Sequence, residues 1–444
     1  MKRREFIKKT SVATAGLFAA PYILPSGRLF AATGSRLANH VVFVLFAGGV
    51  RNQESVDQLY LQDQNSLFAA GNIMNNMLKG NAPSSNLVYT PWSPILSNPL
   101  SKQGTIFKEM RYTQGPTGHY NGHTVAMTGN YTETGLNLNI NPSNPTIFEY
   151  YLKHNSPSQT ALKAWWLSEG LGPYPSLNFS QHPMYGPMYG GNYLHPGTIF
   201  TQAYQFLQNA ENYQPDDVSR ISKLKTFLNQ NFDKVASDLP GIINNDSDKE
   251  LIKNFITNSI QEAENGTLDL PLPPGTLSNE LTGDLINIAA GWQVIKNFKP
   301  EITVINTFNL DNCHSNFSNY INFMHKADYG VGWLWNKIQS DPVMSNDTIL
   351  ICMPEHGRDE SPNSLVDSNG LSAYDHTSDF NSRRMFSLIS GPQGVVNQDS
   401  TIGSLSVPVG EPIDIVPTIA HILGFYNDIP NGFLPGSILN QAFV

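Results

Sequence analysis

Short, uninterrupted apolar runs recur along the chain and end at turn-forming residues. The first spans residues 40–46 and stops at Ala47-Gly48-Gly49. Four further runs occupy residues 161–167, 301–308, 348–353 and 384–390. Continuous apolar runs of this length are typical of strands that are buried on both faces of a parallel sheet.

Helical spacing of apolar residues fills most of the intervals between these runs. The helices expected from it span 146–154, 281–296, 316–339 and 411–423. Alternating strands and helices predict an α/β fold, a three-layer sandwich with a mostly parallel central sheet. In such sheets a ligand lies beyond the carboxyl ends of the strands.

Residues 170–275 break this alternation. An aromatic loop rich in Gly and Pro at 183–191 precedes a polar helical stretch at 216–264, and 271–275 has the composition of a linker. We interpret 170–275 as an inserted, largely helical cap. The aromatic residues Trp165, Trp166, Tyr185 and Tyr189 also raise the alternative of a carbohydrate-binding protein, although packing in a core explains them equally well.

The N-terminus has the outline of a twin-arginine signal peptide, with Arg3-Arg4 ahead of a mildly apolar stretch. We assign residues 1–32 to it and 38–444 to the α/β domain, with the cleavage site open between Ala19-Ala20 and Ala31-Ala32. The stretch is too short for a membrane span, which takes about 20 apolar residues. We expect contact with the twin-arginine export machinery, a periplasmic or extracellular location and no stable span in the mature protein. An amphipathic helix of a cytosolic protein is the alternative.

Charge and cysteine content narrow the function classes. The net charge is −9, only 14% of residues are charged, and Lys and Arg do not cluster beyond the N-terminus. Nucleic-acid binding needs a basic surface, so it is not expected. Two cysteines, Cys313 and Cys352, exclude a disulfide framework but permit one bridge.

Acidic residues and histidines follow two of the predicted strands, and a further histidine lies in a polar loop. Asp311 and His314 come after the run 301–308, Glu355 and His356 come directly after 348–353, and His376 lies in a polar loop. Converging Asp, Glu and His side chains suit Zn²⁺ or Mn²⁺ rather than Ca²⁺. Taken singly, Asp311 is equally consistent with a helix cap, Glu355 with a solvated turn and His376 with an exposed residue.

These motifs resemble those of the alkaline phosphatase and sulfatase superfamily. The resemblance includes the stretches 122–131, 145–153 and 407–424, the last being similar to the Asp-x-x-Pro-Thr helix of sulfatases. Glu355-His-Gly-Arg358 followed by Asp375-His376 is closest to an uncharacterised sulfatase-like family of twin-arginine-exported proteins. The resemblance implies a metal-dependent hydrolase of small anionic phosphate or sulfate esters.

Three departures from the superfamily pattern bear on activity. Ala47 stands where the first strand normally ends in a metal-binding Asp, and Glu355 stands where the acid–His–Gly triplet normally has Asp. The position expected for the nucleophile falls near His119. We expect Asp311, His314, Glu355, His356 and His376 as metal ligands, and Thr124, His119 and Arg358 as candidate catalytic residues, with Arg358 as a fork for an anion. Two questions stay open: His119 and His123 are alternative ligands if helical, and the chain is alternatively an inactive exported binding or surface protein on the same fold.

Overall fold

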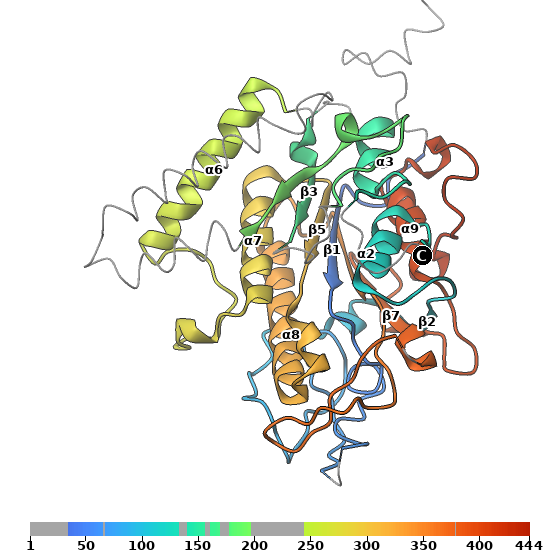
Figure 1. Ribbon diagram of the computed structural model, residues 1–444. Helices are drawn as coiled ribbons and strands as arrows, with labels where there is room; N and C mark the ends of the chain where they lie inside the picture. The colour runs from blue at the N-terminus through green and yellow to red at the C-terminus, as the bar shows by residue number, and fades with distance from the viewer. Residues whose placement is uncertain are drawn as a thin grey trace, which may run out of the picture.

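A twisted sheet of eight strands forms the centre of the described residues, which are 34–64, 67–132, 140–155, 160–168, 177–196, 244–377 and 379–444 of this computed structural model (Figure 1). The strand order is β4-β3-β5-β1-β6-β7-β2-β8. The strands are β1 His40–Phe46, β2 Gly104–Arg111, β3 Ala164–Leu167, β4 Asn192–Leu194, β5 Ile302–Asn306, β6 Thr348–Pro354, β7 Arg384–Ser390 and β8 Ser400–Ile402.

Neighbouring strands are parallel except at β7, which is antiparallel to both β6 and β2. The predicted α/β fold with a mostly parallel sheet is therefore confirmed, and each of the five apolar runs forms a strand. Strand β2 was not predicted from the sequence, because Lys108, Glu109 and Arg111 interrupt its apolar pattern. Glu109 is buried because Arg384 and Arg111 pair with its carboxylate.

Helices cover both faces of the sheet (Figure 1). The α-helices in the described residues are α2 His119–Thr128, α3 Ile147–His154, α6 Asp246–Glu264, α7 Gly283–Phe298, α8 Phe317–Ser340 and α9 Ile415–Ile422. Side chains alternate along β1: Val42 and Val44 join the core beneath α7 and α8, whereas Val41 and Phe43 join the core beneath α2, α3 and α9. Because both faces are buried, β1 is apolar at every position between its ends.

The region predicted as a cap contributes to the sheet. Asn192–Leu194 forms β4, the edge strand of the sheet, which pairs with β3. Within the described part of 170–275, the α-helix is α6. Trp165 and Trp166 are fully buried in β3, which favours packing over a carbohydrate surface. Cys313 and Cys352 are both buried and unbridged.

The predicted signal peptide, residues 1–32, lies outside the described residues. Within the described ranges, no helix combines the length and apolar character that crossing a membrane requires.

Candidate metal centre

The carboxyl ends of β1, β5 and β6 lie level with one another. The register places Leu45 of β1 opposite Asn306 of β5 and Met353 of β6. The turns that follow these strands therefore meet at one edge of the sheet, where the acidic and histidine residues of the sequence motifs are found.

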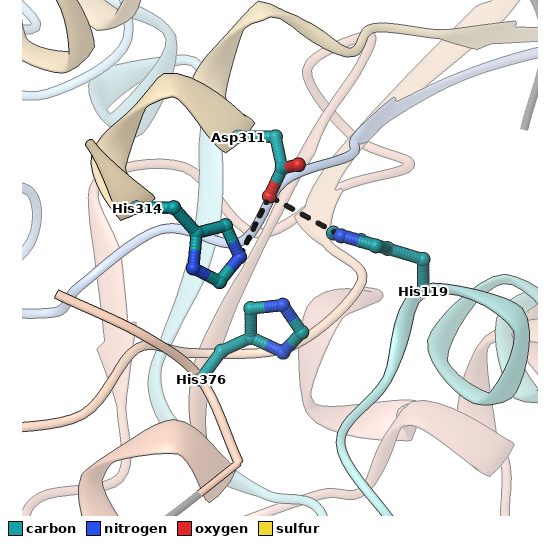
Figure 2. Close-up of side chains that lie close together, drawn as sticks. All are labelled: His119, Asp311, His314 and His376. Carbon is teal, nitrogen blue, oxygen red and sulfur yellow. Dashed lines mark ion pairs between the residues drawn. The ribbon is translucent and has the colours of Figure 1, made fainter. Parts of the chain in front are cut away.

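Four side chains from three separate segments converge at this edge (Figure 2). His119 opens α2, Asp311 and His314 lie in the 3-10 helix Asn309–His314 after β5, and His376 comes from the loop between β6 and β7. Each offers one nitrogen or carboxylate oxygen, and these four atoms all lie within 4.8 Å of one another. Asp311 Oδ1 is 3.2 Å from His119 Nε2 and 3.2 Å from His314 Nε2. The structure thus brings together three of the five predicted ligands and adds His119.

In all three histidines of this group, Nδ1 faces away from the centre and has a hydrogen-bond partner. His119 Nδ1 lies 2.8 Å from Glu355 Oε1, and His314 Nδ1 lies 2.5 Å from Asp375 Oδ1. His376 Nδ1 lies 2.6 Å from the carbonyl oxygen of Thr117. These oxygens only accept hydrogen bonds, so each Nδ1 carries the proton and the neutral ring leaves Nε2 as the donor atom for a cation. Ligating histidines in metalloproteins have this outer partner almost without exception.

Glu355 lies one layer deeper and is fully buried. Its Oε1 accepts a hydrogen bond from Gly48 N at 2.6 Å, and its Oε2 lies 2.5 Å from His123 Nδ1. Glu355, His119 and His356 form a second group whose ligand atoms lie within 4.8 Å of one another. His356 Nε2 is buried and has no hydrogen-bond partner in the described part of the chain, although Glu355 Oε1 is 3.3 Å away. A buried ring nitrogen of this kind fits a cation at the site.

The pKa shifts follow from burial and from close opposite charges. Burial would raise the pKa of Asp311, but hydrogen bonds from His119 and His314 and the charge of Arg358 hold it well below the usual range. Burial is the main cause that lowers the pKa of His376, and the nearby His356 and Arg358 lower it further, which keeps its ring neutral as cation binding requires. Burial disfavours the charged form of His119, yet Glu355 and Asp311 outweigh it and raise the pKa to about 10. A cation bound at Nε2 would displace that proton.

Two glycines after β1 allow this close approach. Gly48 has φ of 92°, and a Cβ there would lie 2.1 Å from Asp311 N. A Cβ on Gly49, whose φ is 71°, would lie 2.5 Å from His356 Nδ1. Ala47 carries no ligand atom, so this turn contributes backbone groups: Gly48 N binds Glu355 and Gly48 O accepts from Arg358 Nε at 2.7 Å.

The structure gives Arg358 a different place from the one expected. Its side chain is fully buried, and it donates to Asp311 Oδ1 at 2.8 Å and to the carbonyl oxygens of Gly48, Tyr374 and Leu310. With its donors directed at protein oxygens, the guanidinium does not present the expected anion fork to solvent. It holds Asp311 instead.

Thr124 lies in α2, five residues after His119. At about 100° per residue it is turned about 140° around the helix from His119, and its side chain is buried. His123 lies on the face of α2 that meets the sheet, where its Nε2 is 2.9 Å from Asn306 Oδ1. Thr117, Asp375 and Asn306 complete the surroundings. Asp375 belongs to the Asp375-His376 motif, but its contact with His314 is not visible in the sequence, because the two residues are distant in the chain.

Comparison with known proteins yields structural matches only. No family model and no curated protein sequence matches the chain. A protein of the alkaline phosphatase superfamily from Vibrio parahaemolyticus is 13% identical, with 96% of this chain and 75% of that chain covered and a TM-score of 0.35. A phosphonate monoester hydrolase from Silicibacter pomeroyi is 13% identical (90% and 76% covered, TM-score 0.41), and a 2-O GAG sulfatase is 14% identical (90% and 73% covered, TM-score 0.39). The matches thus include members of the superfamily that the sequence motifs resemble. Because these TM-scores are below 0.5, fold and site rest on this chain's own strands and side chains.

Proposed function

We propose that the chain is a divalent-cation-dependent hydrolase of small anionic phosphate or sulfate esters. The observation that carries the proposal is the convergence of His119, Asp311, His314 and His376, with each histidine held by its Nδ1 and turned by its Nε2 to the centre. Three imidazole nitrogens and one carboxylate suit Zn²⁺ or Mn²⁺ better than Ca²⁺, which takes oxygen ligands.

Some residues of the centre would bind the cation, and others orient the side chains that bind it. When bound, the cation would polarise an ester oxygen or lower the pKa of a water molecule. Glu355 orients His119, Asp375 orients His314, and Arg358 holds Asp311. The side chains of Asp311 and His314 are 43% and 34% exposed, so an anionic ester has access to the centre from solvent. Glu355 and His356, also expected as metal ligands, are fully buried and form the second ligand group together with His119.

The test combines metal analysis of the purified protein with hydrolysis of aryl phosphates and aryl sulfates. We expect about one equivalent of a transition metal and turnover that chelation removes. His314→Ala should abolish both, whereas His421→Ala, which removes a partly exposed histidine on α9, should change neither. A protein that retains no Zn²⁺ or Mn²⁺ after incubation with either ion would refute the proposal.

The second candidate function is a cation-binding protein without hydrolytic activity. It is favoured by His119 at the position expected for the nucleophile, since both of its ring nitrogens already face carboxylates. Stoichiometric metal without turnover of either ester class would select this candidate.

We also propose export by the twin-arginine route, which the pair Arg3-Arg4 ahead of a mildly apolar stretch supports. The periplasm or the extracellular medium would then be the place of action.

A further inference from the structure

Arg51 is a fully buried cation in the segment that follows β1. Its Nη1 donates to Glu54 Oε1 at 2.9 Å, and its Nη2 donates to Asp63 Oδ2 at 2.7 Å. Taking a guanidinium and a carboxylate out of water is unfavourable for each ion, and well-packed apolar side chains of similar volume often stabilise a fold at least as well. Packing alone therefore does not explain the buried ion pairs of Arg51 with Glu54 and Asp63.

The guanidinium lies over the face of one aromatic ring. Its central carbon is 3.8 Å from the centroid of the Tyr374 ring, a cation–π contact. The hydroxyl group of Tyr374 donates to the same Asp63 Oδ2 at 3.0 Å and accepts from Gln64 Nε2 at 2.9 Å. Arg51 and Asp63 thus fix both the face and the far end of the tyrosine.

Tyr374 immediately precedes two residues of the metal centre, Asp375 and His376. Its backbone N–H donates to Cys313 O at 2.9 Å, and its carbonyl oxygen accepts from Arg358 Nη1 at 2.8 Å. A shift of the Tyr374 ring would therefore move the backbone from which Asp375 reaches His314 and from which His376 reaches the centre.

We propose that Arg51 is a positioning residue of the metal centre, acting through Tyr374 on the placement of Asp375 and His376. The purpose of the buried charge is to hold this loop in one arrangement before a cation arrives. The inference rests on the proposed function, but its first test needs no metal.

The first test is amide hydrogen exchange of the metal-free protein. In Arg51→Met, the amides of residues 373–377 should exchange faster than in the unaltered protein, while those of β1 and β6 should be unchanged. The matched control is Lys326→Met, because Lys326 is also buried, lies 5.4 Å from the Trp92 ring and pairs with Glu280 Oε2 at 2.7 Å. It should lower the melting temperature without affecting residues 373–377.

The second test is titration with Co²⁺, whose absorption bands report the arrangement of its ligands. Arg51→Met should weaken Co²⁺ binding about 10-fold and alter the bands. This is the low end of the loss caused by removing a direct partner of a ligand, because Arg51 acts through Tyr374. Arg51→Lys should recover part of the affinity, and Lys326→Met should bind as the unaltered protein does.

Unchanged exchange at 373–377 in Arg51→Met would overturn the inference, whatever the metal result. If the unaltered protein binds no Co²⁺, the proposed function fails while the exchange experiment still decides the role of Arg51. If Arg51→Met does not fold, Tyr374→Phe replaces it: loss of the hydroxyl contacts should raise exchange at 373–377, and an unchanged rate would contradict the proposal.

Discussion

At the scale of single residues, the centre is defined by the partners behind its histidines more than by the histidines themselves. A histidine on a polar loop has no assignable role until the partner of its Nδ1 is known. For His314 this partner is the carboxylate of Asp375, and for His376 it is a backbone carbonyl. These partners select the tautomer and the direction of each ring, which a ligand type alone does not do.

Asp375→Asn tests this dependence. The substitution removes the charge beside His314 Nδ1, so we expect Zn²⁺ affinity to fall about 10- to 100-fold. The Asp375 side chain is 42% exposed, so the free energy of unfolding of the metal-free protein should change little. Isothermal titration calorimetry and thermal melting measure the two quantities. Asp399→Asn, a change at an exposed carboxylate paired with Lys79, should leave the affinity unaltered, and equal affinities for both variants would contradict the assignment.

Gly48→Ala tests the close approach of β1 to the centre. Both the positive φ and the contact of a Cβ with Asp311 N oppose the methyl group, so we expect a loss of about 3 kcal/mol or more in the free energy of unfolding. Gly370→Ala is the matched control, because Gly370 also has a positive φ but a Cβ there meets nothing within 4 Å. Its cost should stay near 1 kcal/mol, that of the backbone conformation alone. Chemical denaturation measures both, and similar losses would show that crowding at Gly48 contributes nothing.

At the scale of elements, the position of the ligands is set by how strands end and how the next segment begins. Asp284 in the first turn of α7 is buried, and its Oδ1 accepts from Phe308 N at 2.7 Å and from Asn309 N at 3.0 Å. This contact ties the start of the 3-10 helix Asn309–His314 to the neighbouring helix, and the 3-10 helix presents Asp311 and His314 on one side. Burial raises the pKa of Asp284 to about 6 even though these hydrogen bonds oppose the shift.

Asp284→Ala should cost about 2 to 4 kcal/mol in the free energy of unfolding, since two partly buried N–H groups lose their acceptor. It should also weaken cation binding, because the segment 309–314 loses an anchor. Thr282→Ala removes only the N-cap of the same helix and should cost about 1 kcal/mol with unchanged cation affinity. Denaturant unfolding with and without Zn²⁺ distinguishes them; an Asp284→Ala protein with normal affinity would disprove the anchoring.

At the scale of the whole molecule, the centre joins three segments that are distant in the chain. His119 precedes Asp311 by nearly two hundred residues, and His376 lies in the loop between β6 and β7. A cation that binds all three segments binds the folded chain only, so it stabilises the fold by mass action.

We therefore expect Zn²⁺ at 100 times its dissociation constant to raise the free energy of unfolding by about 2.7 kcal/mol. Thermal melting of the chelated and the loaded protein measures the shift. His314→Ala should show no shift, and an equal shift in both proteins would place the ion elsewhere.

Replacing both Arg3 and Arg4 by Lys should retain the protein in the cytoplasm, because the export machinery recognises the arginine pair. Cell fractionation with an antibody to the mature domain provides the measurement. Lys8→Arg with Lys9→Arg keeps the charge of the same segment and should leave export intact. Equal export of the two double variants would argue against the route.

The sequence by itself determined the fold class and the edge of the sheet where the chemistry lies. Strands that are buried on both faces must be apolar throughout, so β1, β5 and β6 can be predicted from the local sequence. Asp311, Glu355 and His356 follow these strands in the sequence. Tertiary structure alone decided which side chains meet. His119 joined the centre, Glu355 turned behind it, and Arg358 and Arg51 became buried supports, because hydrogen bonds and ion pairs between distant segments leave no periodic trace in the sequence.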